Sequence, residues 1–397
     1  MNELRGAPFA FRSAVGVVTR NWAAGTLHLE LPGGREMTLQ GRDQGPEGRL
    51  IVRDFRFIHR VLRTGTVGFG EGYMAGEWDT PDLSRVLEVL ALNFAKFEGV
   101  SFGNPFGTAL NMLSHTLRRN SRQGSKRNIQ AHYDLGNAFY SRWLDSSMTY
   151  SAARFDSPNE TLPDAQQRKY QTLATAMGLK PDHHVLEIGC GWGGFAEYAA
   201  REVGARVTAI TISQEQFEFA RRRMFEQGLA ERADIRLIDY RDVEGQFDRV
   251  ASIEMFEAVG QRYWPTYFDK VREVLKPGGR AGLQIITIRD ELFDHYRRTP
   301  DFIQKYIFPG GMLPSEARLR PAIERAGLTW GQVSRFGGHY AETLALWAQR
   351  FEAAWEDIRT LGFDERFRKL WRFYLSYCEA GFRTERTDVV QLSLARS

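Results

Sequence analysis

The residues best suited to chemistry lie in one short stretch, residues 187–194, which read E-I-G-C-G-W-G-G. A strand-like apolar run at 185–188 leads into it, and apolar residues resume with helical spacing from Phe195. The stretch therefore predicts a strand, a glycine turn and a helix. Glycine permits positive φ and lets a ligand lie against the backbone, and the first helical turn offers free N–H groups and the positive end of its dipole.

Three kinds of ligand suit such a turn: a dinucleotide, a phosphate or S-adenosylmethionine (SAM). A purely structural turn is the fourth interpretation, because a glycine pattern alone is weak. The sequence has no G-x-x-x-x-G-K-[ST] motif, which excludes a P-loop. The acid Glu187 lies beside the turn, and no phosphate-binding lysine accompanies it. This combination favours SAM over ATP. Cys190, inside the turn, fits as a small residue rather than as a nucleophile.

Length and composition are those of an ordinary globular protein. The 397 residues suffice for two domains, and no apolar run reaches the roughly 18–20 residues of a membrane-spanning helix. Residues 1–12 lack the apolar core of a signal peptide, and two cysteines are too few for a disulfide framework or a zinc site. We therefore expect a cytoplasmic protein without a metal site.

The net charge of +4 is unevenly distributed. Residues 1–130 carry 17 Lys and Arg against 12 Asp and Glu, and a basic stretch runs from Arg118 to Arg127. A solvated charged face is one interpretation of this stretch. A surface for phospholipid headgroups is the other, since each basic residue near an anionic leaflet contributes about 1 kcal/mol. No aromatic residue is interleaved with the basic ones, which disfavours single-stranded nucleic acid.

The N-terminal part predicts a small α+β domain. Alternating leucines within 14–52 indicate short strands around a Pro-Gly-Gly turn, 55–62 indicates a helix, and 64–80 indicates a glycine-rich loop. The apolar stripe of a helix at 83–97 predicts a core face rather than a contact with lipid. A connector is expected at 99–107.

From residue 164 onward helices and strands alternate, which predicts a parallel, doubly wound sheet. The expected strands are 185–188, 206–212, 234–238, 247–253 and 280–288, and the expected helices are 164–177, 214–227 and 263–275. Ligands of such sheets bind at the carboxyl ends of the strands, so the site is expected at the glycine turn. The aromatic tail, 341–397, is expected to be helical and to pack as core.

Six motifs occur in one order along the chain. They are His132-Tyr133-Asp134-Leu135-Gly136-Asn137, Met148-Thr149-Tyr150-Ser151, the turn at 187–194, Thr211-Ile212-Ser213-Gln214-Glu215-Gln216, Met255-Phe256-Glu257 and Lys305-Tyr306-Ile307-Phe308-Pro309-Gly310-Gly311. Over residues 60–395 the chain resembles the cyclopropane-fatty-acyl-phospholipid synthases and the related mycolic acid cyclopropane synthases. That family transfers methyl from SAM to the double bond of an unsaturated acyl chain, on a phospholipid in the bacterial enzymes.

The resemblance implies an α/β fold with a Rossmann-like SAM-dependent methyltransferase domain at 164–397. A smaller N-terminal, lipid-associated α+β domain at 1–105 precedes it, and 106–163 supplies a connector and helices that cover substrate and cofactor.

The resemblance also implies the cofactor-binding residues, which are Tyr150, Ser151, Gly189, Gly191, Thr211, Ile212, Gln216, Tyr240 and Arg241. The first two contact SAM from the segment before the sheet, and the two glycines line its amino-acid end. The next three hold the ribose region, and the last two flank the adenine. At the reaction centre, Glu257 lies beside the transferred methyl and Tyr340 closes the site.

The chain departs from this family at the expected bicarbonate site. In the family a cysteine, a glutamate, a histidine and a tyrosine surround a bicarbonate ion that is thought to take the proton for ring closure. Here Ala152 replaces the cysteine and Gln284 replaces the histidine, while Glu257 and Tyr340 remain. Neither alanine nor a neutral amide takes a proton at neutral pH, so bicarbonate is a doubtful ligand. The candidate bases are Glu257 itself and His339, which adjoins Tyr340.

With that base site altered, we expect methylation that stops short of a ring. The cation left by methyl transfer can undergo a hydride shift, and the product is then a methyl- or methylene-branched, or still unsaturated, methylated chain. Three alternatives stay open: an ordinary cyclopropane-fatty-acyl-phospholipid synthase, a small-molecule SAM methyltransferase and a catalytically silent lipid-binding relative.

The expected partner is a phospholipid bilayer with unsaturated acyl chains. The protein is expected to associate peripherally with the inner face of the cytoplasmic membrane, and nucleic acid is not expected as a partner. A homodimer and a redox partner enzyme stay open.

Overall fold

The computed structural model describes residue 4, residues 6–94 and residues 135–397. Three sequence predictions lie outside the described residues: the connector at 99–107, the basic stretch from Arg118 to Arg127, and residues 132–134 of the first motif.

The chain divides into two compact units, which are described separately. The first takes in the described residues of Met1–Leu117 with Arg298–Ile307 and Leu344–Arg386, and the second takes in those of Arg118–Arg297 with Phe308–Thr343 and Thr387–Ser397. The three-part division predicted at residues 105 and 163 stays a prediction.

The first unit is built on a sheet with the strand order β2-β1-β3-β4. The strands are β1 (Ala24–Leu31), β2 (Arg35–Gln40), β3 (Asp43–Val52) and β4 (Trp78–Asp79). β1 pairs antiparallel with β2 and parallel with β3. The alternating residues Leu27, Leu29 and Leu31 of β1 are buried, as the period-2 pattern predicted.

Helices cover this sheet and correct two of the predictions. They are α1 (Phe9–Asn21), α2 (Arg56–Thr64), α3 (Thr66–Met74) and α4 (Leu83–Phe94). Strands predicted from residue 14 begin only at residue 24, because α1 buries Phe11, Ala14 and Val15 along one helical face. α4 buries Leu83, Val86 and Leu87, which confirms its core face.

The loop predicted at 64–80 is wrong, because α3 occupies its first half. The glycines of α3 serve close packing rather than a turn. A Cβ on Gly70 would lie 2.5 Å from the ring of Phe302, and a Cβ on Gly72 would lie 2.8 Å from the Cβ of Phe57. Larger residues at these positions would force the packed side chains apart.

The aromatic tail forms helices as far as residue 383. These are α15 (Gly337–Ala353), α16 (Trp355–Arg359) and α17 (Glu365–Arg383), and their residues Trp347, Trp355 and Trp371 are buried as predicted. The helical prediction is wrong for the last residues, since Thr387–Arg396 forms strand β11. The run V-V-Q-L-S-L within it is rich in strand-forming residues and enters the sheet of the second unit.

The second unit contains a seven-stranded sheet with the order β10-β11-β9-β8-β5-β6-β7. The strands are β5 (His184–Ile188), β6 (Arg206–Thr211), β7 (Ala233–Leu237), β8 (Phe247–Ile253), β9 (Leu275–Ile288), β10 (Leu328–Arg335) and β11. The strands from β7 to β9 in this order are parallel, whereas β11 is antiparallel to both β9 and β10.

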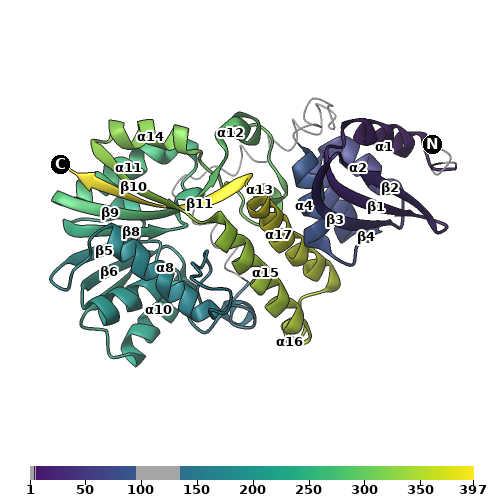
Figure 1. The fold of residues 1–397 in the computed structure, drawn as a ribbon. Coiled ribbons are helices and arrows are strands. Elements are labelled where there is room, and N and C mark those ends of the chain that lie inside the picture. Colours follow the sequence, from purple (N-terminus) through teal and green to yellow (C-terminus); the bar gives the residue numbers. More distant parts are fainter. Residues whose placement is uncertain (1–3, 5, 95–134) are drawn as a thin grey trace. The chain divides into compact units, whose positions relative to one another are not determined.

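Helices cover both faces of this sheet, which confirms a doubly wound α/β fold. They are α8 (Leu162–Ala176), α9 (Gly194–Tyr198), α10 (Gln214–Glu226), α11 (Trp264–Val274), α12 (Asp290–Tyr296) and α14 (Glu316–Arg325). Figure 1 shows α8 and α10 on one face and α11 and α14 on the other. The neighbouring residues Val185 and Leu186 of β5 enter the two opposite cores, as a strand buried on both faces requires.

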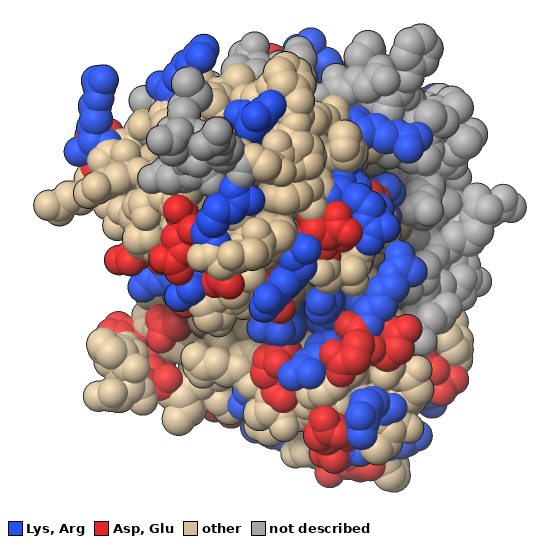
Figure 2. All heavy atoms as spheres, turned by 90° about the vertical axis from the view of Figure 1, so that its right-hand side faces the viewer, with Lys and Arg blue, Asp and Glu red and all other residues tan. Residues whose placement is uncertain are grey.

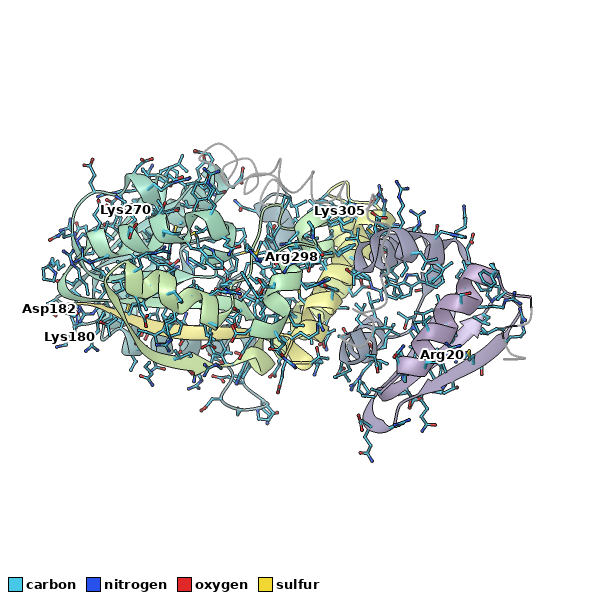
Figure 3. All side chains as sticks on the ribbon, turned by 90° about the horizontal axis from the view of Figure 1, so that it is seen from above. Arg20, Lys180, Asp182, Lys270, Arg298 and Lys305 are labelled. Atoms are coloured by element: carbon cyan, nitrogen blue, oxygen red, sulfur yellow. The ribbon has the colours of Figure 1, made fainter. Side chains whose placement is uncertain are left out.

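The strand order reverses at β5, which lies between β6 and β8. The amino end of β5 follows the loop that carries Lys180 and Asp182, which are labelled at the left-hand end of the molecule in Figure 3. Its carboxyl end, Ile188, leads into the glycine turn. Ligands of doubly wound sheets bind at such a reversal, beside the carboxyl ends of the strands.

No helix in the described part of the chain is long and apolar enough to cross a bilayer.

Candidate active site

The glycine turn leaves open space beside its backbone. Gly189 and Gly191 have φ angles of +82° and +52°, which favour glycine. A Cβ on Gly189 would lie 2.6 Å from Cγ of Met255, whereas a Cβ on Gly191 would meet nothing within 4 Å. Packing therefore requires the first glycine, and the second faces space that a ligand can fill. The turn fits a cofactor laid against the backbone.

Two buried charged residues lie close to the turn, Glu187 of β5 and Lys169 of α8. Burial raises the pKa of Glu187 to about 8 and lowers the pKa of Lys169 to about 7, and the opposite charge of each residue reduces the shift of the other. The Ala196 backbone also forms a hydrogen bond with Glu187, which ties the strand end to α9. Glu187 thus helps to fix the shape of the turn.

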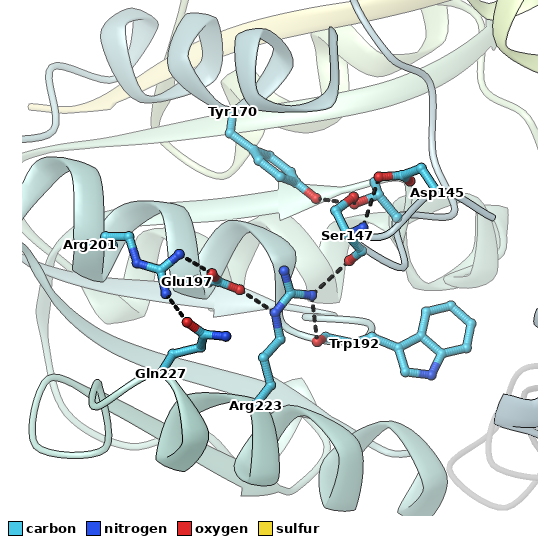
Figure 4. A network of polar contacts seen from close by, with 9 residues as sticks. Asp145, Ser147, Tyr170, Trp192, Glu197, Arg201, Arg223 and Gln227 are labelled. Atoms are coloured by element: carbon cyan, nitrogen blue, oxygen red, sulfur yellow. Dashed lines mark hydrogen bonds and ion pairs between the residues drawn. The ribbon is translucent and has the colours of Figure 1, made fainter. Parts of the chain in front are cut away.

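A network centred on Arg223 of α10 fixes the segment that carries Tyr150 against the turn (Figure 4). Its guanidinium donates to the carbonyl oxygens of Ser147 at 2.7 Å and Trp192 at 3.3 Å. Glu197 of α9 forms ion pairs with both Arg223 and Arg201. Since Trp192 belongs to the turn and Ser147 to the preceding segment, Arg223 joins the two parts of the cofactor site.

Tyr150 and Ser151 follow directly in this segment. The ring of Tyr150 packs against Tyr140 and Trp143, with 5.4 Å and 5.5 Å between ring centroids. The Ser151 hydroxyl accepts a hydrogen bond of 2.7 Å from Nζ of Lys169. Both residues therefore have fixed positions beside the turn.

The three residues predicted to hold the ribose lie together after β6. The Thr211 hydroxyl donates to Oε1 of Gln216 at 2.8 Å, and both side chains are buried. Ile212 lies between them in sequence and is half-buried. Ser213 caps α10, so the end of β6 and the first turn of α10 form one ordered edge.

The two residues predicted to flank the adenine follow β7. Arg241 forms an ion pair with Asp239, with contacts of 2.8 Å and 2.6 Å, and its guanidinium lies 5.4 Å from the centroid of the Tyr240 ring. This pairing raises the pKa of Arg241 and compensates its charge. A compensated pair beside an aromatic ring suits a neutral, flat group.

Three predicted reaction-centre positions converge on a residue that the sequence analysis did not single out, Glu254. Its Oε1 accepts hydrogen bonds of 2.8 Å from the Ala152 N–H and from Nε2 of Gln284, and its Oε2 accepts one of 2.7 Å from the Tyr340 hydroxyl. Glu254 has a φ of +49°, a strained value for a residue other than glycine. A carboxylate thus lies among the positions at which the resemblance predicted a bicarbonate ion.

Glu257 lies in the short helix Phe256–Ala258, close to Glu254. Its Oε1 accepts a hydrogen bond of 2.5 Å from the Ile286 N–H, and its buried Oε2 has no hydrogen-bond partner in the part of the chain that the structure describes. Burial and the charge of Glu254 raise the pKa of Glu257 to about 8. Burial raises the pKa of Glu254 as well, but its three donors and the charge of Lys169 oppose that rise. The three donors around Glu254 match its carboxylate form, whereas a pKa of about 8 leaves Glu257 a carboxylic acid at neutral pH.

His339 has a different environment from Tyr340. Its Nδ1 accepts a hydrogen bond of 3.1 Å from the Phe155 N–H, and the two rings are nearly parallel with centroids 6.3 Å apart. Burial and the nearby charge of Arg154 lower the pKa of His339. These contacts place His339 against the chain that follows Ala152, and its role as a base stays a prediction.

These features define the class of the protein. A doubly wound sheet, an open glycine turn at its reversal point and a covering segment fixed against that turn are the parts of a Rossmann-like SAM-dependent methyltransferase.

Comparisons with known proteins identify the family within this class. The mycolic acid cyclopropane synthetase family matches residues 120–392, and the chain belongs to this family. UfaA1, the tuberculostearic acid methyltransferase of Mycobacterium tuberculosis, is 42% identical over 358 residues, covering 87% of this chain and 82% of the relative. The cyclopropane-fatty-acyl-phospholipid synthase of Escherichia coli is 36% identical over 357 residues, which cover 87% of each chain.

Solved structures agree with this assignment. The crystal structure of mycolic acid cyclopropane synthase CmaA1 complexed with SAH and CTAB has a TM-score of 0.65 and 29% identity, and the match covers 68% of this chain and 98% of that one. The protein is therefore a SAM-dependent fatty acyl methyltransferase of the cyclopropane synthase family.

Proposed function

We propose that the protein methylates the double bond of an unsaturated acyl chain in a membrane phospholipid and that its main product is a branched chain, not a cyclopropane. The position of Glu254 carries this proposal. A tethered carboxylate lies where the family's bicarbonate is expected, held by the Ala152 N–H, Gln284 and Tyr340. Of the relatives described above, the one with the higher identity is named a methyltransferase and the other a cyclopropane synthase.

The chain's residues stabilise a cation on the substrate and then accept a proton from it. SAM, when bound at the glycine turn, supplies an electrophilic methyl group. The π electrons of the alkene form the new carbon–carbon bond, and the neighbouring carbon becomes a cation. The negative charge of Glu254 stabilises this cation, because an anion in a buried site acts through a low effective dielectric.

Two outcomes are open to this cation. Loss of a proton from the new methyl group, with bonding to the cationic carbon, closes a cyclopropane. If a hydride first shifts from the methylated carbon to the cationic carbon, the cation becomes tertiary, and loss of a methyl proton gives an exocyclic methylene group. Both products contain one additional CH2. A saturated methyl branch needs a further hydride and proton, which a redox partner enzyme would supply.

Hydrogen bonding at Glu254 favours the second outcome. Each of its three donors stabilises the carboxylate and lowers its basicity, and the tether prevents it from following the methyl group. Proton removal is then slow enough for the hydride shift to come first. Glu254 is the proton acceptor in this scheme, and Glu257, protonated at neutral pH, lies beside it.

A substrate comparison tests the proposal. The purified protein is incubated with SAM and with vesicles of an unsaturated phospholipid, and in parallel with the same acyl chain as a free acid and as a thioester. Gas chromatography with mass spectrometry of the released chains should show methylation from the phospholipid. Methylation of the free acid or thioester alone would reject the phospholipid substrate.

The proposal includes a peripheral position at the inner face of the cytoplasmic membrane. Residues 1–94 carry 11 basic and 11 acidic side chains, and on the face shown in Figure 2 the two signs are interspersed. The five basic residues of the stretch from Arg118 to Arg127 thus account for the whole positive excess of residues 1–130. An anionic lipid surface attracts such a concentrated charge.

A further inference from the structure

Gln391 of β11 lies directly opposite Gln284 of β9 in the antiparallel ladder. The side chains are 2% and 0% exposed. Nε2 of Gln391 donates to Oε1 of Gln284 at 3.1 Å, and Nε2 of Gln284 donates to Oε1 of Glu254 at 2.8 Å. Two buried amides therefore connect β11 with the proposed base.

The main chain of α8 fixes which way these amides point. Nε2 of Gln391 also donates to the carbonyl oxygen of Lys169 at 3.0 Å, and its Oε1 accepts from the Thr172 hydroxyl at 2.8 Å. A main-chain carbonyl can only accept, so the NH2 end of Gln391 must face it. The same NH2 group then faces the oxygen of Gln284, which leaves the NH2 end of Gln284 for Glu254.

We propose that Gln391 is a positioning residue that holds the Gln284 amide in one orientation, with its NH2 group toward Glu254, and so keeps Glu254 a carboxylate in the active enzyme. This inference rests on the role of Glu254 in the proposed function. Nε2 of Gln284 also makes a longer contact of 3.4 Å with the Ala152 carbonyl oxygen, and the shorter bond from Gln391 holds the opposite end of the amide. With its oxygen held in this way, Gln284 does not turn over to accept a hydrogen bond from protonated Glu254. Oε1 of Glu254 then faces only N–H donors, from Ala152 and Gln284, so a proton on that oxygen would find no acceptor.

Other groups around Glu254 also affect how readily it ionises. Lys169 from α8 favours the carboxylate, Glu257 opposes it by like charge, and Tyr340 from α15 donates to Oε2. Tyr340 has a hydroxyl hydrogen that can rotate, whereas an amide must turn over as a whole. Of these two donors to Glu254, Gln284 is therefore the one whose orientation depends more on a neighbouring residue, Gln391.

Two substitutions and a matched control test the proposal. Gln391→Met keeps the length and apolar volume but removes the donor without adding charge. Gln391→Glu replaces the donor by a carboxyl group. The control is Ser393→Ala, on the same face of β11, which removes a part-buried hydrogen bond of 2.9 Å from the Gln332 N–H of β10. The turnover number is measured as a function of pH, with the melting temperature and with SAM binding by calorimetry.

The expected result is an acid limb of the turnover profile that moves upward by about one pH unit in Gln391→Glu and in the same direction in Gln391→Met. The alkaline plateau and SAM binding should stay unchanged, and Ser393→Ala should change only the melting temperature. If Gln391→Glu does not fold, Gln391→Met decides alone.

Profiles of both Gln391 variants that superimpose on the wild type, with melting temperatures lowered as in Ser393→Ala, would overturn the proposal and leave Gln391 a structural residue. Failure of the proposed function is recognised by other results. A cyclopropane product would reject the proposed branched product without affecting the pH profiles of the Gln391 variants. Full activity of Glu254→Gln would show that Glu254 is not the proton acceptor.

Discussion

The hydroxyl of Tyr340 donates to Oε2 of Glu254 at 2.7 Å, while the opposite oxygen of that carboxylate accepts from Gln284 and from the backbone of Ala152. Residues from three separate parts of the sequence thus bind one carboxylate. The resemblance predicts a bicarbonate ion among the same positions, and in the proposed function Glu254 supplies the negative charge there instead.

Glu254→Gln should abolish most of the turnover. Removing the charge and the proton acceptor together should lower the turnover number by about a hundred- to ten-thousand-fold, the usual contribution of a general base. SAM binding should persist, because the glycine turn is unchanged. Radiolabelled methyl transfer and calorimetry measure the two effects. Glu257→Gln, the matched control, should cost less because Glu257 is already protonated at neutral pH; a larger loss in that variant would make Glu257 the base.

Gly191→Val should remove SAM binding. Gly191 has a φ of +52° beside open space, so valine would fill the space meant for the ligand and strain the backbone. Gly245→Val is the control, since Gly245 also has a positive φ, +97°, and open space, but lies in the turn before β8. Calorimetry should show lost binding only in the first variant. Equal SAM affinity in both would contradict the cofactor site.

The stability of the protein should depend on pH through Glu257. Its folded pKa, about 8, is raised above the ordinary glutamate value of 4.5, so its contribution to stability is complete below about pH 4.5 and is lost as pH rises through 8. Glu257→Gln removes this loss. The melting temperature of the variant relative to the wild type should therefore rise between pH 5 and pH 9. A pH-independent difference would show that burial does not raise the pKa of Glu257.

Binding to anionic vesicles should depend on the stretch from Arg118 to Arg127. Sedimentation with vesicles containing anionic lipid should weaken as salt rises, since exposed charges are screened over about 10 Å at 0.1 M salt. Replacing Arg118, Arg119 and Arg122 by glutamine should weaken binding in the same way. Salt-insensitive binding, or equal binding to neutral vesicles, would instead indicate an apolar contact.

Local sequence patterns were sufficient to predict the glycine turn and the sheet that carries it, but not the role of Glu254. The glycine turn after β5 and the alternation of strands and helices depend on neighbouring residues, and both predictions are confirmed. Glu254 gives no such pattern, because its role depends on partners at 152, 284 and 340 that only the fold brings together. Its one local signal is its place directly after β8, at the carboxyl edge of the sheet.

Strand β11 was missed for a related reason. The helical spacing of aromatic residues in α15 and α17 predicts a helix to the end of the chain, whereas residues 389–394 have the composition of a strand. Gln391 then had no visible function, since a polar residue in an apolar strand makes sense only once its buried partner, Gln284, is known. In the same way, the glycines of α3 predict a loop when only the sequence is considered. Their packing role depends on Phe302, which is distant in sequence and lies against Gly70 in the fold.

The structure of the methylated chain tests the central claim most directly. The protein is incubated with SAM carrying a trideuterated methyl group and with a monounsaturated phospholipid, and the released chains are analysed by mass spectrometry before and after mild hydrogenation. We predict a product that keeps two of the three deuterium atoms and takes up hydrogen, as an exocyclic methylene group does. A dominant product that also keeps two deuterium atoms but resists hydrogenation would be a cyclopropane, and it would contradict the role assigned to Glu254.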